Sequence, residues 1–123
     1  MTPSVFATIM IGVLLNAAAQ LLLKAGVRAT GRIEISGGSL WNAAQTLALE
    51  PHIVGGISCY VLSVVVWIVA LSRVEVSIAY PMLSIGYIVT AVAAWIWLGE
   101  ALSATRIAGI VVIIAGVYLV ARS

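Results

Sequence analysis

The sequence predicts an all-α membrane protein, with four transmembrane helices in a single domain over residues 1–123. Hydrophobic residues make up 63% of the chain and charged residues 8%, and the mean hydropathy is +1.22. Soluble domains carry about 25% charged residues. A transmembrane helix needs about 20 mostly apolar residues to cross about 30 Å of hydrocarbon, and the chain offers four such runs. Each run is too long for a barrel strand and lacks the alternation of one.

The four apolar runs place the predicted spans along the chain. They cover residues 5–23, 53–71, 76–98 and 102–121. The first run contains three consecutive alanines that imitate a signal-peptidase site, but no basic region precedes it, so we treat it as a retained span. Arg106 lies in the first turn of the fourth run and must extend toward the lipid headgroups. The connections after residues 71 and 98 are short, which makes the last three spans antiparallel neighbours.

The connection over residues 24–51 is the only long one. Its second half has apolar residues at helical spacing, namely Leu40, Trp41, Ala44, Leu47 and Ala48. This pattern predicts a short interfacial helix between the first and second spans, with Trp41 at the level of the headgroups. A polar loop with an accidental apolar stripe fits the pattern equally well.

Basic residues are few and are divided between the two membrane faces. The predicted spans place Lys24, Arg28, Arg32 and Arg106 on one face, and Arg73 and Arg122 on the other. Since orientation follows the excess of basic residues in cytoplasmic loops, this division specifies it only weakly, and insertion in both orientations stays open. The net charge of +2, without a basic run, does not fit a nucleic-acid-binding protein.

Polar residues interrupt the third span in a regular way. Its hydroxyl side chains recur at offsets of three, four and three: Ser77, Tyr80, Ser84 and Tyr87. On a helix they share one face, which we expect to lie toward the inside of the bundle, while apolar residues such as Met82 form a separate stripe. Pro81 has no amide hydrogen and predicts a kink beside these hydroxyls. The face forms either one wall of a polar pathway or a set of interhelical hydrogen bonds.

The first span carries a polar ridge. Gly12, Asn16, Gln20 and Lys24 follow one another at intervals of four residues. An unpaired amide is costly in lipid, so Asn16 and Gln20 must face other helices or a wet cavity. Lys24 marks the interface, where it is either an ordinary lysine reaching the headgroups or part of a site.

Small residues mark two further helix faces. In the second span they accompany Trp67 on one side, which predicts close helix packing: Gly56, Cys59, Ser63 and Ala70. In the fourth span Gly109 and Gly116 are seven residues apart and return a bare patch to the same face every two turns. That patch fits a contact between subunits and an internal contact equally well.

The residues needed for enzyme chemistry do not come together in this sequence. His52 is the only histidine, Cys59 the only cysteine, and the four glutamates all fall in loops or at span ends. We therefore predict no enzyme activity, no metal site and no cofactor, which leaves transport, channel or assembly roles.

Several stretches resemble one group of small transporters. They are AAAQLLLKAG (17–26), YVLSVVVWIVAL (60–71), VSIAYPMLSIGYIV (76–89), the GEAL turn at 99–102 and AGIVVIIAGV (108–117). With these stretches the chain resembles the drug/metabolite transporter superfamily, which includes four-helix proteins of the small multidrug resistance type. Within it the chain is similar to the ArnE/ArnF-type subunits of the undecaprenyl-phosphate-aminoarabinose flippase. The multidrug exporters carry a membrane-embedded glutamate where this chain has Asn16, and an amide cannot exchange a proton.

The resemblance implies a flippase, or a flippase subunit, of the bacterial inner membrane. Its substrate would be a polyprenyl-phosphate-linked sugar, and its partner a second copy or a paralogous subunit. Lys24 matches the lysine of the QLxxK pattern of that family, with Gln20 before it and Arg28 one turn beyond. Asn16, Tyr80, Ser84 and Tyr87 would then bind sugar hydroxyls. The alternatives are a small exporter of cations or metabolites and a non-transporting assembly partner of a membrane glycosyltransferase.

Overall fold

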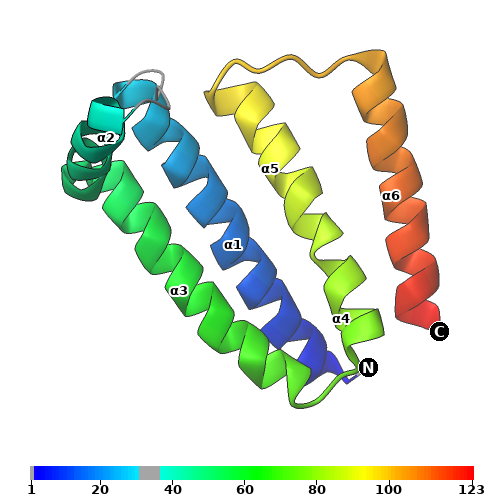
Figure 1. The fold of residues 1–123 in the computed structure, drawn as a ribbon. Helices are drawn as coiled ribbons and strands as arrows, with labels where there is room; N and C mark the ends of the chain where they lie inside the picture. Colours follow the sequence, from blue (N-terminus) through cyan, green and yellow to red (C-terminus); the bar gives the residue numbers. More distant parts are fainter. Residues whose placement is uncertain (1, 31–36) are drawn as a thin grey trace.

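A computed structural model describes residues 2–30 and 37–123, and within these ranges the chain consists of α-helices and connecting segments (Figure 1). The helices are α1 (Pro3–Thr30), α2 (Gly37–Leu49), α3 (Pro51–Leu71), α4 (Val76–Met82), α5 (Ser84–Trp97) and α6 (Ala104–Arg122). The all-α prediction is confirmed.

The predicted spans correspond to α1, α3, the pair α4–α5, and α6, and each is long and apolar enough to cross a membrane. Both chain termini lie at the same end of the molecule (Figure 1). The largest boundary difference is at α1, which continues to Thr30 although the predicted span ends at residue 23. Lys24 and Arg28 end the apolar run but not the helix, because lysine and arginine are good helix formers.

The start of α3 is fixed by the side chain before it. The carboxylate of Glu50 accepts hydrogen bonds from the backbone N–H groups of His52 (2.8 Å) and Ile53 (3.2 Å), and Pro51 occupies the first helical position. The ring of His52 also lies 3.0 Å from this carboxylate. That side-chain hydrogen bond, with the two backbone bonds, lowers the pKa of Glu50 from its usual value.

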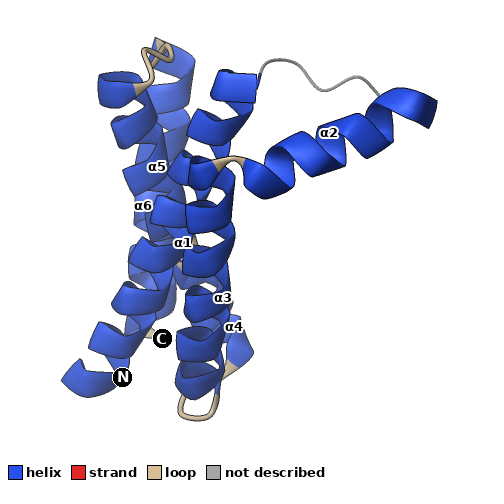
Figure 2. Cartoon of the chain, turned by 90° about the vertical axis from the view of Figure 1, so that its left-hand side faces the viewer, coloured by secondary structure: helices blue, strands red, loops and turns tan. Residues whose placement is uncertain are grey.

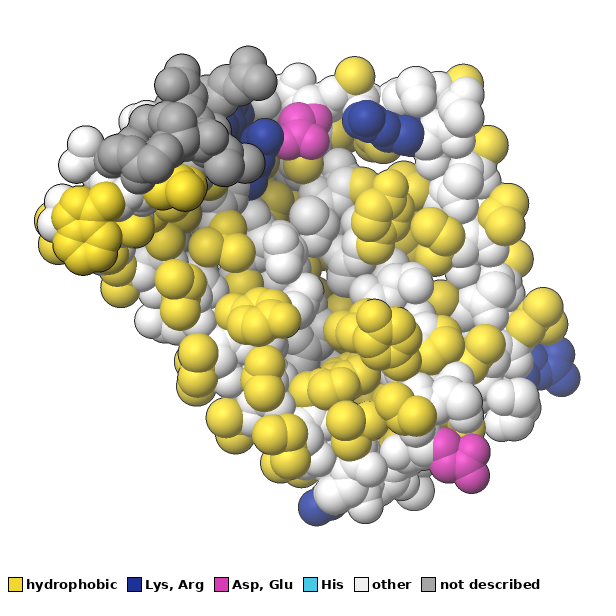
Figure 3. All heavy atoms as spheres, in the orientation of Figure 1, with side chains coloured by type: hydrophobic (Ala, Val, Ile, Leu, Met, Phe, Trp, Pro, Cys, Tyr) yellow, Lys and Arg dark blue, Asp and Glu magenta, His cyan; other side chains and the backbone are white. Residues whose placement is uncertain are grey.

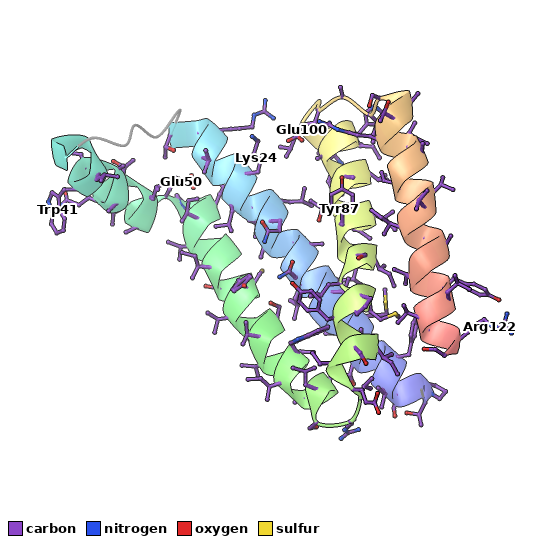
Figure 4. All side chains as sticks on the ribbon, turned by 45° about the vertical axis from the view of Figure 1, so that its right-hand side comes forward. Lys24, Trp41, Glu50, Tyr87, Glu100 and Arg122 are labelled. Atoms are coloured by element: carbon purple, nitrogen blue, oxygen red, sulfur yellow. The ribbon has the colours of Figure 1, made fainter. Side chains whose placement is uncertain are left out.

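Helix α2 projects sideways from the bundle (Figure 2). The helical alternative for this connection is confirmed and the loop alternative is wrong. Trp41 is 69% exposed and lies toward the end of α2 that is far from the bundle (Figure 4). The position of α2 at the membrane interface stays a prediction.

Helices α1 and α3 form the most extensive pair in the bundle. Gly56 is buried there, and a Cβ added to it would lie 3.1 Å from the carbonyl oxygen of Ala19 and 3.0 Å from the side chain of Leu23. Ser63 and Ala70 are buried on the same face of α3. The prediction that this small-residue face packs closely is therefore confirmed.

The best-buried part of the core lies where α1, α3 and α4 come together. It consists of Val5, Ile9, Val13, Ala70 and Met82. The apolar stripe of the third span thus supplies the core residue Met82, whereas Tyr80 and Tyr87 are 65% and 52% exposed. The expectation that the polar face lies inside the bundle does not hold within a single chain. Lipid tails solvate apolar side chains as well as a protein core does, so burial does not sort the two faces as it does in water.

Helix α6 lies at the edge of the bundle (Figure 1). Ile110 is its only buried residue. Gly109 and Gly116 are exposed, and nothing lies within 4 Å of a Cβ added to either glycine. The internal contact considered for this glycine pair is therefore wrong, and a contact between subunits stays a prediction.

Charged side chains gather at the two ends of the molecule, with an apolar belt between them on the face that Figure 3 shows. Lys24 and Glu100 lie at one end and Arg122 at the other (Figure 4). Arg32, which we assigned to the same face as Lys24, lies outside the described residues. The belt fits a protein that spans a bilayer.

Candidate functional site

A pocket of about 200 Å³ lies between α1, α3 and α4, part-way along the bundle. Its lining residues are Gly12, Asn16, Tyr60, Ser63, Val64, Trp67, Tyr80 and Leu83. We call it the central pocket. The polar ridge of the first span and the hydroxyl face of the third meet here, through Asn16 and Tyr80.

The central pocket has room because the residues on two of its walls, Gly12 and Ser63, are small. Gly12 contributes no side chain on α1. On α3 the hydroxyl of Ser63, which is 4% exposed, donates a hydrogen bond to the carbonyl oxygen of Tyr60 at 2.6 Å. This bond satisfies the hydroxyl within its own helix. Asn16 and the two tyrosines are left to offer polar atoms to a ligand.

The third wall of the central pocket lies at a break in the helix. Regular α4 ends at Met82, and the backbone N–H groups of Leu83 and Gly86 bond to carbonyl oxygens only three residues earlier. Pro81 offers no N–H to the carbonyl of Ser77. The helix is thus interrupted beside Pro81, and the interruption falls between Tyr80 and Leu83, both of which line the pocket.

A second pocket of about 240 Å³ lies between α5 and α6 near the loop that joins them. Its lining residues are Tyr87, Thr90, Ala91, Ala94, Glu100, Ala101, Leu102 and Arg106. We call it the loop pocket. The guanidinium of Arg106 donates a hydrogen bond to the carbonyl oxygen of Ala101 at 2.6 Å. The predicted site residue Tyr87 therefore lines a different pocket from Tyr80.

The basic residues of α1 lie at the same end of the molecule as the loop pocket. Arg28 donates a hydrogen bond from Nη1 to the carbonyl oxygen of Leu98 at 2.9 Å, which joins the end of α1 to the end of α5. Lys24 is exposed and lies at the level of Glu100 (Figure 4). Among the described residues, this end thus combines Lys24, Arg28 and Arg106 with two glutamates, Glu100 and Glu50 (Figure 4).

The structure brings together some of the predicted site residues and separates others. Asn16 and Tyr80 share the central pocket, and Tyr87 lies in the loop pocket. Gln20, Lys24 and Arg28 are exposed on the last turns of α1, and Ser84 is partly buried and lines neither pocket.

The sequence reasoning missed several residues of both pockets. On α3 they include Tyr60, which was not singled out, and Trp67, which was assigned only to a packing face. Tyr60, Ser63 and Trp67 stand at offsets of three and four, and this spacing of aromatic and hydroxyl side chains was the available signal. Glu100 and Arg106 were treated as loop and interface residues, and nothing in their local pattern indicated that they line the same pocket.

The comparisons with known proteins identify the family of the chain. Residues 4–122 match the model of the EamA-like transporter family. The chain belongs to this family. As an EamA-like protein it is a multi-pass membrane protein of a transporter family, not an enzyme, which confirms the class inferred from the sequence.

Relatives of this EamA-like protein include probable flippase subunits from several bacteria. The probable 4-amino-4-deoxy-L-arabinose-phosphoundecaprenol flippase subunit ArnF of Shewanella sediminis is 34% identical over 120 residues, which cover 90% of this chain and 83% of the relative. The ArnF subunit of Photorhabdus laumondii is 32% identical, with 92% and 93% covered. The ArnE subunit of Sodalis glossinidius is 35% identical, with 85% of each chain covered. No solved structure matches the chain.

Proposed function

We propose that this EamA-like protein is a flippase subunit that moves a polyprenyl-phosphate-linked sugar between the leaflets of the bacterial inner membrane. The observation that carries the proposal is the central pocket, which offers the neutral amide of Asn16 and the hydroxyls of Tyr60 and Tyr80 among apolar walls. Neutral hydrogen-bonding groups of this kind suit sugar hydroxyls. The names of the relatives add the chemical class of the lipid.

The openness of the central pocket favours a lipid substrate. Tyr60 and Tyr80 are 46% and 65% exposed on the outer surface of the helices, so the pocket is reached from the side. A headgroup can occupy polar contacts there while its polyprenyl tail stays in lipid, which avoids the cost of moving a phosphate and a sugar bare through hydrocarbon. An exporter of soluble metabolites would need an enclosed path, and an assembly partner would need no pocket.

Replacing Asn16 by leucine tests this proposal. We expect purified protein in vesicles to expose the lipid-linked sugar to an impermeant reagent about tenfold more slowly after the change, because a buried sugar hydroxyl loses its partner. The matched control is Asn42→Leu, the same change at an exposed site on α2, away from the pocket. Equal rates for wild type and both folded variants would contradict the role of the central pocket.

A second subunit completes the proposed carrier. Helix α6 makes few contacts with its own chain and exposes its glycine face, and small residues let two helices in a membrane approach closely. The relatives include both ArnE and ArnF subunits. The partner is therefore a second copy or a paralogous subunit that packs against Gly109 and Gly116.

Leucine at both Gly109 and Gly116 should weaken this association, because the added side chains keep the facing backbone away. We expect crosslinking between subunits in membranes to fall at least about fivefold. The control is leucine at Ala108 and Ala115, which are also exposed and seven residues apart but face about 100° away on the helix. If both pairs of changes have the same effect, the glycine face is not the contact.

A further inference from the structure

A carboxylate and a guanidinium line the loop pocket together, and the function proposed above uses neither of them. Glu100 and Arg106 belong to the connection after α5 and to the first turn of α6, and Tyr87 and Thr90 of α5 line the same pocket. An anionic group, a cationic group and two hydroxyls thus converge within about 240 Å³.

We propose that the loop pocket binds the sugar ring of the headgroup at one end of the route, before the ring reaches the central pocket, and that Glu100 selects sugars with a positively charged amine there. In this arrangement the carboxylate of Glu100 accepts hydrogen bonds from the ammonium group, and Arg106 binds the phosphate. The inference rests on the proposed flippase function and makes it more specific, because it names the residue that distinguishes an amino sugar from a neutral one.

The size of the loop pocket fits a single sugar ring. Sites for drug-sized ligands measure about 300–1,000 Å³, so about 240 Å³ leaves room for one ring but not for an oligosaccharide. The room comes from Ala91 and Ala94, which face the pocket with methyl groups only. Tyr87 and Thr90 lie one turn apart on the same helix as these alanines, where their hydroxyls can reach the hydroxyls of the sugar ring.

The backbone of α5 holds Glu100 in place at the mouth of this pocket. Helix α5 ends at Trp97, and Gly99, two residues later, has a left-handed φ of +70°, a conformation that favours glycine. The N–H of Glu100 then turns back and donates to the carbonyl oxygen of Ala94 at 3.2 Å. Only the side chain of Glu100 is left to rotate, so its carboxylate stays beside the pocket.

The carboxylate of Glu100 is available to a ligand. Within the described part of the chain the only ion pair joins His52 to Glu50. The neighbouring guanidinium of Arg106 is held instead by the carbonyl oxygen of Ala101 at 2.6 Å. That bond uses one of five donors, so Arg106 can still bind a phosphate while Glu100 keeps its oxygens free.

The surrounding charges fit a headgroup that carries both signs. Within the described residues, Lys24, Arg28 and Arg106 share this end of the molecule with Glu100 and Glu50 (Figure 4). The carboxylate of Glu50 is already bonded to His52 and to the first N–H groups of α3. A phosphate is attracted by the cations, and an amine on the sugar ring can reach the carboxylate of Glu100, which lines the pocket. A neutral sugar phosphate would leave that carboxylate without a partner.

Binding of two synthetic lipids to the purified protein in lipid nanodiscs tests the inference. One probe is a short-chain prenyl phosphodiester of an aminopentose, and the other is the same compound with its amine acetylated. We expect wild type to bind the free amine about two- to fivefold more tightly by calorimetry, the range that an exposed ion pair gives. Glu100→Gln should bring the ratio of the two affinities close to one.

The matched control is Glu75→Gln, because Glu75 is an exposed carboxylate at the other end of the molecule. A preference for the amine that survives in Glu100→Gln, or that Glu75→Gln removes equally, overturns the assignment of Glu100. Equal binding of both probes to wild type also overturns it and leaves the flippase proposal standing. The comparison of the two probes on the wild-type protein does not depend on whether either variant folds. If neither probe binds wild type, the proposed function itself is wrong.

Discussion

Replacing Lys24 by alanine is expected to lower translocation of the sugar lipid at least about tenfold, because a hydrogen bond to a charged group is worth about 1.5–3 kcal/mol. Lys24 is exposed at the basic end of α1, across from α5, where the route proposed above would bring a lipid phosphate to the protein first. Without its ammonium group the phosphate loses a cationic contact at the first step of its path. The measurement is the rate at which an impermeant reagent reaches the sugar in reconstituted vesicles.

Arg122→Ala is the control for this experiment. Arg122 lies at the opposite end of the molecule (Figure 4), with its guanidinium over the ring of Tyr118 at 5.6 Å, away from both the central pocket and Lys24. We expect it to change translocation much less than Lys24→Ala does. Normal translocation by folded Lys24→Ala protein, or an equal loss in both variants, would remove Lys24 from the route.

Valine at Gly56 is expected to destabilise the fold by about 1–3 kcal/mol or more, the usual cost of overpacking a tight core. A Cβ at this position lies 3.1 Å from the backbone oxygen of Ala19 and 3.0 Å from the side chain of Leu23. Backbone cannot move aside as a flexible side chain can, so α1 and α3 must separate. The fraction of folded protein in a denaturant titration reports the change.

The neighbouring residue provides the comparison for Gly56. A Cβ at Gly55 meets only the tip of Leu22, at 3.7 Å, which is ordinary contact. Gly55→Val therefore carries the same change in helix propensity without the collision, and we expect it to unfold close to the wild-type midpoint. If both variants unfold at the same denaturant concentration, the close contact of α1 with α3 at Gly56 contributes nothing specific.

The spans were predictable because a bilayer constrains length and polarity together. A run of about 20 apolar residues has few alternatives in a membrane, and the break at Pro81 follows from its missing N–H. The end of α1 was not predictable in the same way. Lys24 and Arg28 end the apolar run, but the helix continues to Thr30, since hydropathy reports the surroundings of a helix and not its hydrogen bonds.

The sequence predicted only those site residues that lie on the polar faces of the predicted spans. Asn16 and Tyr80 were singled out as unusual polar groups in apolar surroundings, and they meet in the central pocket. Tyr87 shares a predicted face with Tyr80 but lines the loop pocket. Glu100 and Arg106 lie on either side of a turn. Whether they line the same pocket depends on the path of that turn, which helical periodicity does not describe.

The marginal packing of α6 has a consequence for the order in which the protein is made. All buried residues of the main core lie between Val5 and Met82, and α6 adds only the partly buried Val117 to it, so the buried core residues are all synthesised before α6. The last helix then enters the membrane beside a bundle that is already packed, with its glycine face still unoccupied. If this chain assembles with the second subunit proposed above, it can therefore fold before it associates, and the supply of that subunit, not the folding of this chain, would limit how many complete carriers form.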